Sequence, residues 1–113
     1  MKKKFIIKSP NEFDHIINNG KKINGKIITL YYYPSDNNKV YFGFAVGKKI
    51  GNAVDRNKVK RKIRMIVHNN QFLFSNKYKY IIMLRKDCLL FSHDSWEKDL
   101  VNILGKVNEN EKN

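Results

Sequence analysis

The sequence has little that would support a disulfide, a metal site or a membrane span. Cys88 is the only cysteine, so no intrachain disulfide can form. His15, His68 and His93 are scattered and give no Cys/His metal spacing. The first apolar stretch ends at Lys8, too early for a signal peptide, and no apolar run approaches the ~20 residues of a membrane-spanning helix. We therefore expect a cytoplasmic protein that holds no metal by itself, with Cys88 as a small, part-buried apolar side chain.

Acidic residues are also scarce. Asp and Glu total 10 against 23 Lys and Arg, which gives a net charge of +13 on 113 residues. Such an imbalance predicts a polyanionic partner, most commonly nucleic acid; an anionic membrane surface and a merely solvated basic surface are the alternatives. The acids form no pair with metal-site spacing and no His/acid constellation, so a self-sufficient nuclease is not expected.

Length and hydrophobic content predict one globular domain, and the order of the elements predicted along it indicates the α+β class. The 42% of hydrophobic residues can form a modest core, and 113 residues suit a single domain, residues 1–113, with a frayed polar tail over 108–113. Ser9 as N-cap, Pro10 at the first helical position and Glu12 completing a capping box predict a first helix that ends at Gly20.

The remaining pattern predicts three strands and two more helices. Residues 27–33 and 40–46 are predicted to form an antiparallel hairpin with a long loop, and residues 78–85 a third strand. A helix is expected over 53–68, and a last helix starts near Ser92 or Asp94, with Trp96 as its core anchor. The order is α-β-β-α-β-α. Helices should cover one sheet face, leaving the other partly open as a place for a single nucleic-acid strand.

Residues 47–64 are the most informative part of the chain, because they hold eight basic residues and one acid. On a helix, Val59, Ile63, Ile66 and Val67 would share the apolar face. Asn57, Arg61, Arg64 and His68 would lie opposite, Lys60 and Arg56 at one border, and Lys58 and Lys62 toward the other. Arginine forks bind phosphate oxygens bidentately, so the exposed row predicts RNA contact.

This segment is similar to the signature of the ribonuclease P protein family. That pattern runs Lys-Lys, Gly, Ala-Val, Arg-Asn, Lys-Arg and Arg, and it is matched here by Lys48-Lys49, Gly51, Ala53-Val54, Arg56-Asn57, Lys60-Arg61 and Arg64. The resemblance extends over nearly the whole chain, since residues 11–20 resemble the family's first helix and Leu30-Tyr31 its first strand. Two positions depart from the family: Ile17 stands where an aromatic is common, and Met65 where Glu is common.

The resemblance implies a fold and a function. The fold would be a small mixed sheet covered by helices, with a left-handed β-α-β crossover through the basic helix. The chain would be a monomer in a 1:1 complex with ribonuclease P RNA, which with Mg²⁺ removes the 5′ leader of precursor tRNA; no protein residue would be catalytic. The residues implied to bind the catalytic RNA are Lys48, Lys49, Arg56, Asn57, Lys58, Lys60, Arg61 and Arg64. Those implied to bind the leader are Phe13, Ile17, Thr29 and Tyr31.

Other interpretations remain open at this point. Phe13 and Ile17 could be core residues, because core and cleft side chains look alike in sequence. In a strand Tyr31 and Tyr33 share one face with Thr29, so only one set can line a cleft. A ribosomal or general RNA-binding module fits the size and charge equally well. Lys2, Lys3, Lys4, Arg85 and Lys86 would add nonspecific attraction to phosphate.

Overall fold

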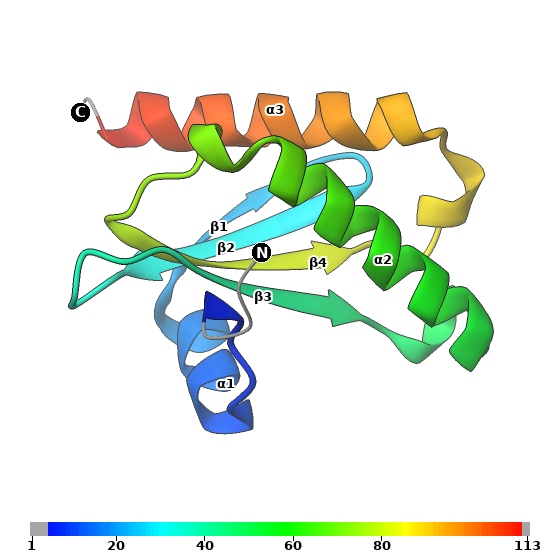
Figure 1. Cartoon of the computed structure of the whole chain (residues 1–113), viewed down its shortest axis with the longest axis horizontal. Coiled ribbons are helices and arrows are strands. Elements are labelled where there is room, and N and C mark those ends of the chain that lie inside the picture. The colour runs from blue at the N-terminus through cyan, green and yellow to red at the C-terminus, as the bar shows by residue number, and fades with distance from the viewer. Residues whose placement is uncertain (1–4, 112–113) are drawn as a thin grey trace.

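The computed structural model describes residues 5–111, in which three α-helices pack on a four-stranded mixed sheet (Figure 1). The helices are α1 Pro10–Asn19, α2 Ala53–Asn69 and α3 His93–Glu111. The strands are β1 Lys21–Asn24, β2 Ile28–Pro34, β3 Tyr41–Val46 and β4 Tyr78–Leu84. The predicted α+β class is confirmed, as are the helices to within about a turn at their ends.

The predicted antiparallel hairpin of residues 27–33 with residues 40–46, which correspond to β2 and β3, is wrong. The sheet order is β1-β2-β4-β3, so β4 lies between β2 and β3, antiparallel to the first and parallel to the second. Ile81 and Ile82 are fully buried on opposite faces of β4, which suits a central strand rather than an edge. The loop after Pro34 passes the start of β4, where the Ser35 N–H donates to the Lys77 carbonyl at 2.7 Å.

Helices lie on both faces of this sheet. α2 and α3 cover one face and α1 packs on part of the other, so the second face is less open than predicted (Figure 1). Seen from the side of α2 and α3 with β3 pointing up, β4 lies to the left of β3 (Figure 1). The crossover is therefore left-handed, as the family resemblance implied, against a right-handed preference of about 98% in general.

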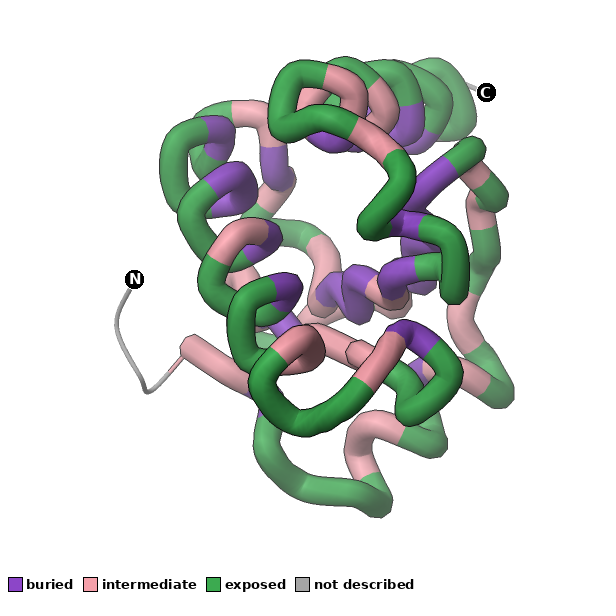
Figure 2. The backbone as a smooth tube through the Cα atoms, turned by 90° about the vertical axis from the view of Figure 1, so that its right-hand side faces the viewer, coloured by how far each residue is buried: buried purple, intermediate pink, exposed green. Residues whose placement is uncertain are grey.

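The main core lies between the sheet and the helices α2 and α3, whose buried turns face inward (Figure 2). Trp96 is completely buried there and donates its indole N–H to the Cys88 carbonyl at 3.0 Å, which confirms it as the anchor of α3. Cys88 is itself buried, as an apolar residue would be. No helix within residues 5–111 is long and apolar enough to cross a membrane.

A short strand, β1, was not predicted. It pairs with β2 through four residues, and its turn into β2 is held by the Asp99 carboxylate of α3. That carboxylate accepts the backbone N–H groups of Lys26, Ile27 and Ile28 at 2.9 to 3.1 Å. A side chain at Gly25 would collide with it, because an added Cβ would lie 2.5 Å from Asp99 Oδ2.

The chain ends also differ from expectation. Ser9 caps α1 by accepting the Glu12 N–H at 3.4 Å, but the Glu12 side chain reaches Lys79 of β4 instead of closing a capping box. The segment predicted as a frayed tail is helical up to Glu111, and Asn110 donates to the Tyr32 hydroxyl at 3.3 Å. The last two residues lie outside the described part.

Candidate nucleic-acid interface

The exposed side of α2 carries the basic row predicted from the sequence. Val59, Ile63, Ile66 and Val67 face the core, so the opposite side of the helix meets solvent. Asn52 begins this helix by accepting the Asp55 N–H at 2.9 Å, a cap that the sequence reading missed. The predicted RNA-contacting residues are exposed except for Arg56, which is half-buried: Lys48, Lys49, Asn57, Lys58, Lys60, Arg61 and Arg64.

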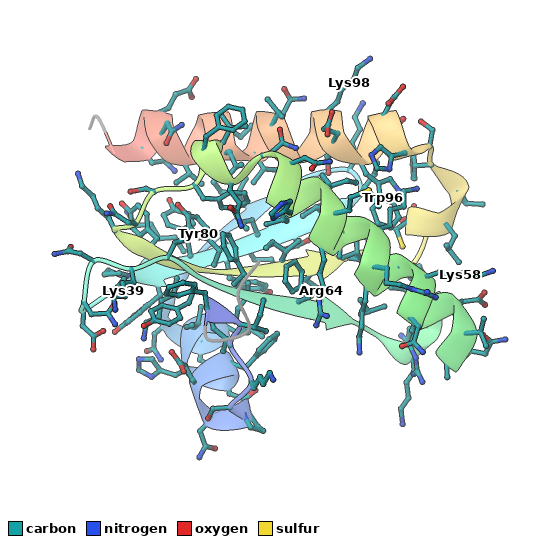
Figure 3. All side chains as sticks on the ribbon, in the orientation of Figure 1. Lys39, Lys58, Arg64, Tyr80, Trp96 and Lys98 are labelled. Atoms are coloured by element: carbon teal, nitrogen blue, oxygen red, sulfur yellow. The ribbon has the colours of Figure 1, made fainter. Side chains whose placement is uncertain are left out.

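The two borders of this row meet different neighbours. The Arg64 guanidinium carbon lies 5.6 Å from the centre of the Phe44 ring, so Arg64 leans toward β3 (Figure 3). Lys62 leans the other way, with Nζ 4.1 Å from the centre of the Trp96 ring, and is partly buried. The row available to RNA is thus the exposed ridge and the β3 border, while Lys62 belongs to the packing of α2 against α3.

The predicted leader residues gather on the sheet face that α1 partly covers. Thr29 and Tyr31 lie on this face of β2, and Phe13 and Ile17 of α1 pack in one cluster with Tyr31 and Ile81. Tyr31 is only 9% exposed and Thr29 only 6%. In this arrangement α1 covers most of the Tyr31 ring, so the ring presents little surface on which a base could stack.

An ion pair fastens α1 to this face. Lys79 Nζ lies 2.9 Å from Glu12 Oε1, and the Tyr41 ring lies 5.5 Å from the same ammonium. The hydrogen bond that Lys79 donates to the Glu12 carboxylate raises the pKa of Lys79 above its ordinary value, against the opposing effect of burial. A pair that reaches solvent in this way contributes about 1 kcal/mol or less. Lys79 is thus occupied by the protein itself and is not free for phosphate.

Two hollows lie near each other, one beside the loop before α2 and the other at the uncovered end of the sheet face. One, of about 460 Å³, is lined by Lys48, Lys49 and Ile50 together with Leu84 and Lys86. The other, of about 330 Å³, contains Thr29 and shares Leu84 and Lys86 with the first. The predicted RNA-binding loop and the predicted leader face therefore adjoin at Lys86.

The sequence analysis did not predict the contribution of β1 to this surface. Lys22 and Asn24 of β1 line the second hollow, whereas Lys86, which was expected to attract phosphate, lines both hollows. The four residues of β1 include a single apolar one, Ile23, which is too weak an alternation to indicate a strand. Gly20 and Gly25, which flank these four residues, were the one sequence signal that a short strand lies between two turns.

Within residues 5–111 no three His, Cys, Asp or Glu side chains lie close enough together to hold a metal ion. The exposed Arg85 and Lys86 follow β4 and line the second hollow, which places them beside the other cations of the surface. Lys2, Lys3 and Lys4 lie outside the described residues. The described surface is thus basic and hollowed, and it suits binding of a polyanion.

Comparison with known proteins points to one family. The sequence profile of the family described as Ribonuclease P matches residues 1–108. A ribonuclease P protein component of Mycoplasma mycoides is 41% identical over 108 residues, covering 95% of this chain and 99% of that protein. One from Streptococcus agalactiae is 32% identical over 104 residues, covering 92% and 94%.

Solved structures share the fold. A mutant of the Staphylococcus aureus RNase P protein aligns with a TM-score of 0.85 at 24% identity, covering 94% of this chain and 90% of that one. The RNase P protein of Thermotoga maritima aligns with a TM-score of 0.79 at 20% identity, covering 88% and 94%. These structures show a shared fold, and the family profile over residues 1–108 together with the 41% identical relative confirms the resemblance carried by residues 48–64: the chain belongs to the bacterial ribonuclease P protein family.

Proposed function

We propose that this chain binds ribonuclease P RNA through α2 and the loop before it, and binds the 5′ leader of precursor tRNA on the neighbouring sheet face. Family membership implies the catalytic RNA as partner. The observation that carries the proposal is the position of Lys86, which lines both the hollow beside Lys48 and Lys49 and the hollow containing Thr29. A leader that passes from the first hollow to the second would have lysine or arginine side chains beside its phosphates along the way.

The division of labour follows from the residues present. The chain offers arginine guanidinium groups and lysine ammonium groups that can bind phosphate, but no cluster of metal-ligating side chains within residues 5–111. Hydrolysis would therefore be the work of the RNA subunit with Mg²⁺, in the bacterial cytoplasm. The protein, as one copy per RNA, would hold the leader and so favour precursor over mature tRNA.

The test adds purified protein to ribonuclease P RNA and a 5′-extended precursor tRNA, at a magnesium level where the RNA alone is nearly silent. We expect restored cleavage at the mature 5′ end. No stimulation by folded protein that still binds RNA would favour a general RNA-binding module instead. Cleavage by the protein without the RNA would overturn the assignment of chemistry to the RNA.

The contact surface is tested by removing two charges. The double variant Arg61→Ala/Arg64→Ala should bind the catalytic RNA more weakly and with a shallower dependence on salt, since each phosphate contact contributes about 0.9 to the slope of log K against log[salt]. The control is Lys98→Ala/Lys106→Ala, which removes two exposed charges from α3 (Figure 3). Equal effects of both double variants would show that only net charge matters.

A further inference from the structure

We propose that Lys22 and Asn24 of β1 form one wall of a nucleotide subsite, in which Lys22 attracts a leader phosphate and Asn24 reads the base beside it. The subsite is the hollow of about 330 Å³ between β1 and the end of β4. This volume lies at the small end of ligand sites, which run from about 300 to 1,000 Å³. The inference rests on the proposed function, because it takes the leader as occupant.

The wall is held in place by the rest of the fold. All four residues of β1 pair with β2, Lys22 opposite Tyr31 and Asn24 opposite Thr29. The turn that follows is fastened to α3, because the Asp99 carboxylate accepts three consecutive backbone N–H groups. An edge strand anchored at its turn presents its side chains at fixed positions, as a recognition site requires.

The side-chain amide of Asn24 has donor groups that are available to a ligand. Its Oδ1 accepts the Thr29 hydroxyl at 3.3 Å, which turns the amide so that its oxygen is already used. Within residues 5–111 no acceptor is hydrogen-bonded to its Nδ2, and the side chain is exposed at the hollow. An amide N–H₂ offers two donors, so it fits a base edge that presents acceptors.

The charges around the hollow suit a phosphodiester. Lys22 stands on one side, with Nζ 5.7 Å from the centre of the Tyr31 ring, and Arg85 and Lys86 stand on the other. Against these three cations the lining holds one acid, Asp87. Met83 supplies a polarizable apolar surface for a base or ribose. The hollow thus offers cations for a phosphate, an amide for a base edge and an apolar surface for a base or ribose, which are the contacts that one nucleotide of a single strand makes.

The occupant is the leader rather than another anion because of the hollow's neighbours. The same hollow contains Thr29 and shares Leu84 and Lys86 with the hollow beside Lys48 and Lys49. A single strand that passes from the proposed RNA-binding surface of α2 onto the sheet face would meet Lys22 and Asn24 before it reaches the part of the face covered by α1. The subsite is the accessible end of the leader path, whereas the Tyr31 ring farther along lies mostly beneath α1.

The experiment measures cleavage of a pool of precursor tRNAs with randomised leaders by the reconstituted holoenzyme. Relative kcat/KM values then give a base preference at each leader position. Asn24→Ala should flatten the preference at one position by about 2–10-fold, the value of one or two neutral hydrogen bonds, and leave the other positions unchanged. Asn24→Asp keeps the acceptor for Thr29 but replaces the donor by a charged acceptor, so it should change which base is preferred there.

Lys22 is tested by salt dependence with a control from the same strand. Lys22→Ala should weaken precursor binding for every leader sequence and lower the salt slope by about 0.7, the value for one single-strand phosphate contact. Lys21→Ala removes the same charge from the next residue, which points to the opposite face of the sheet, and should leave the slope of leader binding unchanged. Thermal unfolding of each variant establishes that the fold is retained.

The outcomes separate this subsite from the proposed function as a whole. If wild-type protein does not stimulate cleavage, the proposed function itself fails. If it does stimulate, but Asn24→Ala and Asn24→Asp give the wild-type preference at every position, Asn24 does not read a base. Equal salt slopes for the Lys22 and Lys21 variants would likewise overturn the role of Lys22.

Discussion

Lysine residues of the basic segment differ in role: some face solvent and are available to RNA, and others pack against the protein. Lys60 is exposed on the row that faces solvent, whereas Lys62, two positions on, is partly buried over the Trp96 ring. The helical period separates them, because two residues advance the helix by about 200°. Net charge therefore overstates the number of cations available to RNA.

Burial raises the pKa of the Cys88 thiol, so this cysteine is held in its neutral, unreactive form.

The difference between Lys60 and Lys62 can be measured with single substitutions. Lys62→Ala should lower the free energy of unfolding by about 0.5–2 kcal/mol, because it removes the cation from the Trp96 ring, and should leave affinity for the catalytic RNA nearly unchanged. Lys60→Ala should do the reverse. Urea unfolding followed by Trp96 fluorescence and a binding titration report the two quantities. A loss of RNA affinity for Lys62→Ala as large as that for Lys60→Ala would contradict this assignment.

At the scale of elements, helices were easier to predict than strand pairing. Ser9, Pro10 and the apolar period identified α1 and α2, since these signals are local. The position of β4 between β2 and β3 was not predictable from the loop, because pairing depends on which strand is buried on both faces. Alternation along the strand correctly predicted that Thr29 and Tyr31 share one face of β2. The extent to which α1 covers Tyr31 depends on the packing of the helix on the sheet, which no local signal in the sequence gives.

The contact between α3 and the β1–β2 turn gives a prediction about elements. Asp99→Ala would leave the N–H groups of Lys26, Ile27 and Ile28 without their acceptor, and should cost about 2–4 kcal/mol of unfolding free energy. Glu109→Ala, which removes an equal charge from an exposed position of the same helix, should cost far less. Chemical unfolding of both variants tests this. A similar, small change in both would mean that water replaces Asp99 without loss.

At the scale of the whole molecule, the charge of +13 opposes compaction. Most Lys and Arg side chains of residues 5–111 are exposed, so they repel one another through solvent and are screened by salt. The hydrophobic core must offset this repulsion in the free protein. Binding to a polyanion removes it, which couples the stability of the fold to the presence of RNA.

The free protein should therefore become more stable as ionic strength rises. We expect Tm to increase by a few degrees between low and moderate NaCl, given that about 1 kcal/mol corresponds to roughly 4 °C or more in a domain of this size. The variant Lys98→Glu/Lys106→Glu lowers the net charge by four at exposed positions of α3 and should show a smaller increase. Calorimetry at several salt concentrations checks both. A Tm independent of salt would mean that the charges are too dispersed to matter.

The central place of β4 also bears on how the protein is made. A ribosome delivers β1, β2, β3 and the basic helix before β4, yet β2 and β3 have no common partner until β4 arrives between them. The nascent chain can form helices early, because their hydrogen bonds are local, but the sheet must wait for the strand that completes it. The basic helix is thus displayed near ribosomal RNA before the fold that orients it exists, so synthesis must finish before correct RNA binding can begin.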